Sequence, residues 1–317
     1  MSGNAESMTR GTGSDEGMST AEQDTAATLR HVVGSNERQL AHLDAQATAY
    51  AASTRLLLRA AGIRQGMRVL DLGTGLGHVA FELAQLVGDD GEVVGIDQSA
   101  DHLAVADRRR ATAGLDTVRF VEADVNSYRD DEWFDAVVAR FLPCHASDAL
   151  AVLDHHVAAL PAGGRIVALD FDCGTWRTDP PVDLADARRD WILEAIRRGG
   201  GKPMAGARLG VLLRDAGLAE VESLGVQPYI APGDPAAAAS IAGLLSSLAP
   251  QIVAAGIASA AELNLGDAES DIARALVQSY SVYLPPTLAG AWGVRRTPGP
   301  AAQSSVQLST QQPQEQR

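Results

Sequence analysis

The sequence is poor in cysteine, in basic residues and in aromatic side chains. Its 317 residues include two cysteines, Cys144 and Cys173, which excludes a disulfide-built scaffold and makes a reducing compartment the expectation. Lysine and arginine number 26 against 40 aspartates and glutamates. The resulting net charge of −14 repels phosphate backbones, so we expect no nucleic-acid partner. No cysteine–histidine cluster has the spacing of metal ligands, and we expect no metal site.

An uninterrupted long apolar run is also lacking. The stretch 235–261 carries no charge, but Pro250 interrupts it and serines dilute it. A membrane-spanning helix needs about 20 predominantly apolar residues. Here the large apolar residues recur every three or four positions, which is the single stripe of a half-buried helix. The residues of this stripe are Ile241, Leu244, Leu245, Leu248 and Ile252. We therefore expect a helix that covers a core or a substrate cleft, and no membrane partner.

Both ends of the sequence differ from its middle in composition. Residues 1–28 and 298–317 are polar and of low complexity, and we predict a disordered leader and a disordered tail. The leader has neither the apolar stretch of a signal peptide nor an arginine-rich transit pattern, so a cytoplasmic location is expected. Residues 29–62 are predicted to form a helical N-terminal cover with two helical patterns, which Gly62 ends.

The middle of the chain alternates strand and helix patterns. Strands are predicted at 67–72, 93–96, 118–121, 134–139 and 165–169, with helices at 78–87, 99–113 and 149–160. This alternation predicts βαβ units, and hence an α/β fold with a mostly parallel sheet and helices on both faces. Beyond residue 170 we predict helices at 183–198 and 208–216, strands at 218–226, 280–284 and 288–294, and a helical insertion at about 228–278 before the last strand.

A glycine-rich turn follows the first of these strands. The segment Asp71-Leu72-Gly73-Thr74-Gly75-Leu76-Gly77 lies between a predicted strand and a predicted helix, where glycines let a ligand approach bare backbone. Dinucleotide sites use G-x-G-x-x-G, but His78 stands where the last of those glycines would be. Asp71 would repel a pyrophosphate and could hold an ammonium group.

Acidic residues also end the second and third predicted strands. Asp97 follows the turn at about the spacing of a ribose-binding carboxylate, which is roughly 20 residues. Asp124 could meet the exocyclic amine of adenine. Ligands of open α/β sheets bind at the carboxyl ends of the strands. Three acidic residues at three such ends suit a cationic nucleoside that carries an amino-acid tail.

Five segments together resemble the class I S-adenosylmethionine-dependent methyltransferases, in their bacterial small-molecule branch of quinone-biosynthesis-like and secondary-metabolite enzymes. The segments are 69–77, 94–97, 123–125, 134–140 and 160–165. The resemblance implies a Rossmann-like, doubly wound α/β fold with a seven-stranded sheet over 63–297, and S-adenosyl-L-methionine as cofactor. It places cofactor contacts on Asp71, Gly73, Thr74, Gly75, Gly77, Asp97, Gln98, Asp124, Val125 and Arg140, and on Gln46 in an N-terminal helix that closes over the cofactor.

The acceptor of the methyl group is indicated mainly by a missing motif. Enzymes that methylate nucleobase or glutamine amino groups resemble one another in an Asn/Asp-Pro-Pro-Tyr/Phe motif after the fourth strand, where this chain has the unrelated segment 139–145. With the acidic charge, this favours a small-molecule substrate in specialised metabolism. We expect O-methylation ahead of N- or C-methylation, with His145 as a candidate catalytic base. Aromatic residues that could line the substrate pocket are Trp176, Trp191, Tyr280 and Tyr283.

Two other functions remain open at this point. One is an NAD(P)-dependent oxidoreductase, against which Asp71 and His78 argue. The other is a protein that binds S-adenosylmethionine without transferring its methyl group, since a functional class is not fixed by a fold. The N-terminal helices could exchange between two copies of the chain, so a homodimer is a further expectation.

Overall fold

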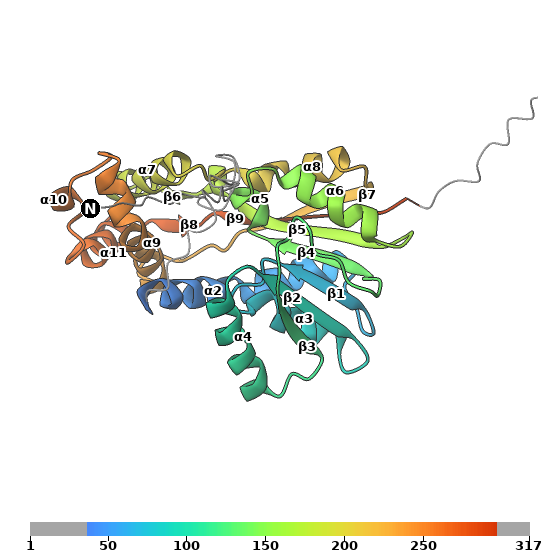
Figure 1. Ribbon diagram of the computed structural model, residues 1–317. Coiled ribbons are helices and arrows are strands. Elements are labelled where there is room, and N and C mark those ends of the chain that lie inside the picture. Colours follow the sequence, from blue (N-terminus) through green and yellow to red (C-terminus); the bar gives the residue numbers. More distant parts are fainter. Residues whose placement is uncertain (1–36, 297–317) are drawn as a thin grey trace, which may run out of the picture.

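The computed structural model describes residues 37–296, and a seven-stranded sheet forms its centre (Figure 1). Six strands run parallel and β9 runs antiparallel to both of its neighbours. The predicted mostly parallel α/β sheet is thereby confirmed. In spatial order the strands are β3 (Val118–Glu122), β2 (Glu92–Asp97), β1 (Arg68–Leu72), β4 (Ala136–Arg140), β5 (Arg165–Asp172), β9 (Thr287–Val294) and β7 (Ala219–Val226).

Helices cover both faces of this sheet because its strands are apolar on both sides. Successive strand residues point to opposite faces. Val69 of β1 packs in the cluster with α2 (Glu37–Ala60) and α3 (His78–Val87). Its neighbour Leu70 packs in the opposite cluster, with α6 (Ala149–Ala159) and α8 (Leu209–Asp215). We call these the α2 face and the α6 face. The helix α4 (Ala100–Ala113) connects β2 to β3 and contacts both strands.

The N-terminal cover is one continuous helix, α2, where the sequence predicted two helical patterns. The spacing of the apolar residues suggested two separate helices. No glycine or proline interrupts 37–60, so one helix continues to Ala60, just before Gly62. Its carboxyl-terminal half is anchored by Leu57 and Leu58, which are completely buried against the sheet. Residues 29–36 of the predicted cover, and the predicted leader and tail, lie outside the described residues.

A helical group packs at one end of the molecule, away from β1–β3 (Figure 1). The group consists of the predicted helical insertion and of α7. Because both contribute side chains to one buried cluster, the insertion does not form a separate layer. The sequence missed the short strand β6 (Arg177–Asp179), which pairs with β8 (Val282–Leu284) in a separate two-stranded sheet. The helices of the group are α7 (Asp183–Arg198), α9 (Pro235–Ala254), α10 (Ala260–Leu263) and α11 (Ala268–Gln278).

The charge-free helix α9 is long and apolar enough to cross a membrane by length and composition alone. In the structure it packs against α7 and α11 with the expected stripe inward. Ile241, Leu245 and Ile252 are buried, and Leu244 and Leu248 are partly buried against the same cluster. The prediction of a half-buried amphipathic helix is confirmed.

Candidate functional site

The α2 face of the sheet gathers the predicted charged residues at its carboxyl-terminal edge. β1 lies between β2 and β4. Asp71 shares its face with Val69, Asp97 with Val93, and Arg140 with Val138, because side chains alternate along a strand. Three neighbouring strands therefore deliver two carboxylates and one guanidinium to the same edge, beneath α2.

The glycine turn contains two open glycines and one packed glycine. Gly73 and Gly75 have φ angles of 67° and 53°, and a Cβ added to Gly73 would meet nothing within 4 Å. A Cβ on Gly75 would meet only the Gly73 carbonyl oxygen, at 4.0 Å. Gly77 is different, because a Cβ there would lie 2.7 Å from the Phe81 ring and 3.0 Å from that of Phe120. The structure thus gives Gly77 a packing role, and its predicted cofactor contact stays a prediction.

Asp97 shapes the turn from the neighbouring strand. One carboxylate oxygen accepts a hydrogen bond from the Gly75 N–H at 2.9 Å, and the other accepts from the Ser99 N–H at 2.9 Å. Each oxygen keeps a second lone pair, so two hydroxyl groups can still donate to this carboxylate. Gln98, next to it, is exposed at the same edge. These positions fit the ribose contacts that the sequence predicts.

Asp71 and Thr74 are polar side chains buried in the site. Asp71 is 1% exposed, and neither its Oδ2 atom nor the Thr74 Oγ1 atom has a hydrogen-bond partner among the described residues. Burial raises the pKa of Asp71 to about 7, although the neighbouring Thr74 side chain and the Arg140 charge both act to lower it. A buried carboxyl oxygen without a partner is costly, so this position favours a ligand that carries a positive charge or donates a hydrogen bond.

Arg140 ends β4 beside Asp71. Its Nη1 atom donates to the Thr54 Oγ1 atom of α2 at 3.3 Å. Burial lowers the pKa of Arg140, and the charges of Asp71 and Glu82 act in the opposite direction. Arginine remains protonated in proteins, so this side chain supplies a fixed positive charge that can hold a carboxylate.

Asp124 and Val125 lie just beyond β3. Asp124 is exposed, and one of its oxygens accepts from the backbone and side-chain N–H groups of Asn126 at 2.8 and 2.7 Å. Val125 is buried, and its carbonyl oxygen lies 2.8 Å from the His156 Nε2 atom. His155 Nε2 lies 3.0 Å from the Tyr128 carbonyl oxygen. The adjacent histidines therefore brace the β3–β4 connection.

His145 lies at the end of a one-turn helix that the sequence did not predict, α5 (Leu142–His145). Phe141, just before it, adopts φ 61°, which is strained for a residue with a side chain. His145 is exposed on this turn, yet desolvation by the protein around it lowers the pKa of its imidazole. A lowered pKa keeps the ring neutral near pH 7, the form in which it can accept a proton.

A buried carboxyl group holds this turn in place. Asp170 of β5 accepts from the Cys144 N–H at 2.8 Å and from the Phe171 N–H at 2.8 Å. It is 1% exposed, and burial raises its pKa to about 7. Cys144 itself is not an activated nucleophile, because burial raises the pKa of its thiol.

Three half-buried aromatic rings lie where α2 crosses β4 and β5. The Phe171 ring is 4.6 Å from that of Phe141 and 4.8 Å from that of Tyr50, which is on α2. Arg140 lies over the Phe141 ring at 5.0 Å. An apolar aromatic surface therefore borders the cationic end of the site.

Several sequence-predicted residues do not join this constellation. Gln46 is partly buried on α2, and its predicted cofactor contact stays a prediction. Tyr280 is 81% exposed, so the expectation that it lines a pocket is wrong. Trp176 and Tyr283 are buried in the cluster of the helical group, and Trp191 packs beneath Arg188.

Conversely, the sequence reasoning missed Tyr50, Thr54, Phe141, Phe171 and Asp170. No local motif marks them. Phe141 directly follows Arg140 at the end of β4, and the other four meet the site only through the packing of α2 and β5.

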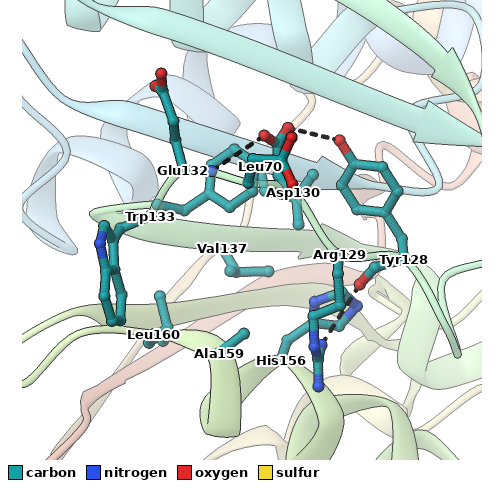
Figure 2. Close-up of a pocket in the computed structure, with 12 residues that line it drawn as sticks. Leu70, Tyr128, Arg129, Asp130, Glu132, Trp133, Val137, His156, Ala159 and Leu160 are labelled. Carbon is teal, nitrogen blue, oxygen red and sulfur yellow. Dashed lines mark hydrogen bonds between the residues drawn. The ribbon is translucent and has the colours of Figure 1, made fainter.

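A cleft of about 250 Å³ opens at the opposite edge of the sheet (Figure 2). Leu70 and Val137 form its floor, and exposed Trp133 forms one wall. Its main acidic group is already paired: Asp130 accepts from the Tyr128 hydroxyl at 2.8 Å and contacts Arg68 at 3.2 Å. Trp133 precedes β4, so this cleft lies at the amino-terminal ends of the strands and is separate from the glycine turn.

Comparison with known proteins identifies the part of the chain that holds the glycine turn. Residues 63–194 match the model of a family described as a methyltransferase domain. This range contains β1–β5, and hence Asp71, Asp97 and Arg140. It begins after α2, so the match does not cover the helix that lies over the site.

Curated relatives match over about a third of the chain. A ubiquinone/menaquinone biosynthesis C-methyltransferase from Coxiella burnetii is 35% identical over 111 residues, which is 34% of this chain and 44% of that protein. Its counterpart from Idiomarina loihiensis is 33% identical over 119 residues, which is 37% of this chain and 47% of that protein. The chain therefore spans less than half the length of these relatives. Among solved structures, a Haemonchus contortus phosphoethanolamine N-methyltransferase in complex with S-adenosyl-L-methionine matches with a TM-score of 0.47, at 18% identity over 78% of this chain and 53% of that one.

Proposed function

Because the chain carries a class I methyltransferase domain, we propose that it transfers a methyl group from S-adenosyl-L-methionine to a small-molecule acceptor. The observation that carries the proposal is the open glycine turn between a buried, unpartnered carboxyl oxygen of Asp71 and the guanidinium of Arg140. When bound, the cofactor supplies an electrophilic methyl group on its sulfonium.

The residues present fit this cofactor. The free space beyond Gly73 and Gly75 lets a ligand lie against bare backbone. Asp71 and Arg140 would hold the ammonium and carboxylate groups of an amino-acid tail, since they offer opposite charges at one edge. Asp97 and Asp124 would accept from the ribose hydroxyls and from the adenine amine. An NAD(P) pyrophosphate would meet Asp71 instead, which disfavours an oxidoreductase.

Catalysis by this chain would rest mainly on orientation. Holding the acceptor in line with the methyl group can supply a large part of the rate enhancement. The α5 turn, Phe141 and Phe171 lie beyond β4 and β5, where they would position an acceptor under α2. α2 would exclude water from the same region.

Oxygen is the acceptor atom that we favour. The support is the position of His145 on the α5 turn that follows β4, where an imidazole that is neutral near pH 7 can accept a hydroxyl proton. Carbon is the second candidate, because the curated relatives are named as C-methyltransferases. The motifs shared with the small-molecule branch support our proposal of a reaction in specialised metabolism, whereas the curated relatives are named for ubiquinone and menaquinone biosynthesis.

We also propose a cytoplasmic location and a homodimer. Two free cysteines, Cys144 and Cys173, agree with a reducing compartment.

The homodimer has separate support. Leu56 of α2 is 49% exposed and offers an apolar contact for a second copy. Sedimentation of the wild type and of a Leu56→Glu variant tests the dimer. We expect dimers of the wild type and monomers of the variant.

Calorimetric titration with S-adenosylhomocysteine, beside NADH and NADPH, tests the cofactor. We expect micromolar or tighter binding of S-adenosylhomocysteine, and loss of most of it in Asp97→Ala. Asp116→Ala is the matched control, since this exposed carboxylate precedes β3 at the opposite edge. Binding of a nicotinamide nucleotide alone would make the protein an oxidoreductase candidate instead.

Labelled methyl donor and a panel of phenols, alcohols, carbon acids and amines then test the acceptor. Product analysis by mass spectrometry and NMR assigns the methylated atom. Tight cofactor binding without turnover across the panel would favour a protein that binds the cofactor without transferring its methyl group.

A further inference from the structure

One carboxylate of α2 is bound to both helices that flank the glycine turn. Asp44 accepts two hydrogen bonds from the Arg109 guanidinium of α4, at 2.9 and 2.8 Å. The His78 Nε2 atom lies 2.7 Å from the same carboxylate. His78 is the first residue of α3 and directly follows Gly77 of the turn. We call Asp44, His78 and Arg109 the Asp44 latch.

The protonation of the latch follows from its surroundings. Burial lowers the pKa of His78, against the attraction of Asp44, so the ring is neutral near pH 7. At 2.7 Å its Nε2–H then donates to the carboxylate. The Arg109 Nη1 atom lies 3.2 Å from His78 Nε2, but both atoms are then donors, so this approach is not a hydrogen bond. The charge of Asp44 is therefore balanced by Arg109 alone.

The two halves of α2 are held in different ways. Its carboxyl-terminal half is anchored by Leu57, Leu58 and Thr54, each completely buried. In the amino-terminal half, the side chain of Asp44 is 40% exposed, and those of Arg109 and His78 are 34% and 23% exposed. Solvent-exposed ion pairs contribute little to stability, so such a contact can open while the anchored half stays packed.

The position of the latch determines what its opening would expose. α2 contacts α3, β9 and the helical group, and runs between that group and the strands that carry the site (Figure 1). Thr54 of α2 touches Arg140 inside the site, and Asp44 lies about three turns before it. A ligand on the glycine turn would therefore lie beneath the span of α2 between these two contacts.

We propose that Asp44 is a positioning residue, which fixes α2 across the cofactor site through His78 and Arg109 and thereby slows the exchange of cofactor and product. This inference rests on the proposed function, since it concerns the same site. Asp44 touches neither the reacting atoms nor the open face of the glycine turn. Its effect falls on binding kinetics, and methyl transfer itself is left to the residues of β4 and α5.

Stopped-flow displacement of S-adenosylhomocysteine tests the latch. We expect Asp44→Asn and Arg109→Gln each to raise the dissociation rate about fivefold, and the KM for S-adenosylmethionine to rise in parallel, with kcat within about twofold. The double variant should be no faster than either single one, because both changes remove the same contact. Asp44→Glu, which keeps the charge, should restore most of the slow dissociation.

A matched control lies on the same helix as Arg109. Asp107 forms an exposed pair with Arg110 one turn away, and Asp107→Asn should leave the dissociation rate unchanged. Unfolding in urea separates a loss of stability from a loss of the latch. An Asp44→Asn variant with wild-type dissociation kinetics would overturn the latch alone. Failure of the wild type to bind S-adenosylhomocysteine would overturn the proposed function, and this inference with it.

Discussion

The carboxylate of Asp170 accepts a hydrogen bond from the backbone N–H of Cys144 at 2.8 Å. The bond joins the end of β5 to the one-turn helix α5, which carries His145. A buried strand residue thus sets the position of a loop that borders the candidate acceptor site, while the glycine turn lies two strands away.

Replacing Asp170 should affect the α5 turn more than the cofactor site. In Asp170→Ala the buried N–H of Cys144 loses its acceptor, which costs about 1–3 kcal/mol of unfolding free energy. We expect lower kcat, with S-adenosylhomocysteine affinity within about threefold of the wild type. Urea unfolding and calorimetry measure the two effects. Unchanged kcat in a destabilised protein would show that the turn does not serve catalysis.

Cofactor binding should depend on pH through Asp71. Its carboxyl has a pKa of about 7 in the free protein, and an ammonium group binds the ionised form. The affinity for S-adenosylhomocysteine should therefore rise as pH increases from about 5 to 7, by at most tenfold per pH unit, and level off above. At pH 6 binding should release protons, which titrations in two buffers of different ionisation enthalpy detect. Asp71→Asn should abolish the pH dependence; a wild-type affinity that is flat with pH would refute the ammonium contact.

The two kinds of glycine in the turn should respond differently to alanine. Gly75→Ala strains a backbone with φ 53°, at about 1–2 kcal/mol, and places a methyl group where a ligand would lie. We expect affinity for S-adenosylhomocysteine to fall at least about tenfold. Gly77→Ala adds a clash with Phe81 and Phe120, worth about 1–3 kcal/mol more of lost stability. Thermal unfolding and calorimetry compare them, and a Gly75→Ala variant that binds normally would remove the turn from the site.

His145 should matter only when a hydroxyl proton must be removed. His145→Gln should lower kcat for phenol or alcohol acceptors by about 10²–10⁴-fold, with the KM for S-adenosylmethionine little changed. In the wild type kcat should rise with pH through the lowered pKa of His145 and then level off, and the variant should lose this limb. His155→Gln is the control, because that ring lies on α6 against the Tyr128 carbonyl. Equal rates for the His145 variant would point to an acceptor that needs no base.

Local patterns were sufficient to predict the sheet and most of the charged residues at its carboxyl-terminal edge. Strand and helix periodicity predicted the alternation from β1 to β5, and the glycines marked the turn that follows β1. Asp71, Asp97 and Arg140 could be placed because the carboxyl ends of parallel strands share one edge of a sheet. The fate of Gly77 could not be predicted, since Phe120 comes to it from β3.

The sequence by itself determined the fold class, the strand edge at which we propose cofactor binding, and the charges presented there, because these depend on short-range periodicity and on residues next to strand ends. Only the tertiary structure decided that α2 is one helix, that Asp44 reaches Arg109 and His78, and that Asp170 holds the turn of His145. These contacts join residues far apart in the chain. Their partners are chosen by the packing of whole elements, for which a single sequence carries no local signal.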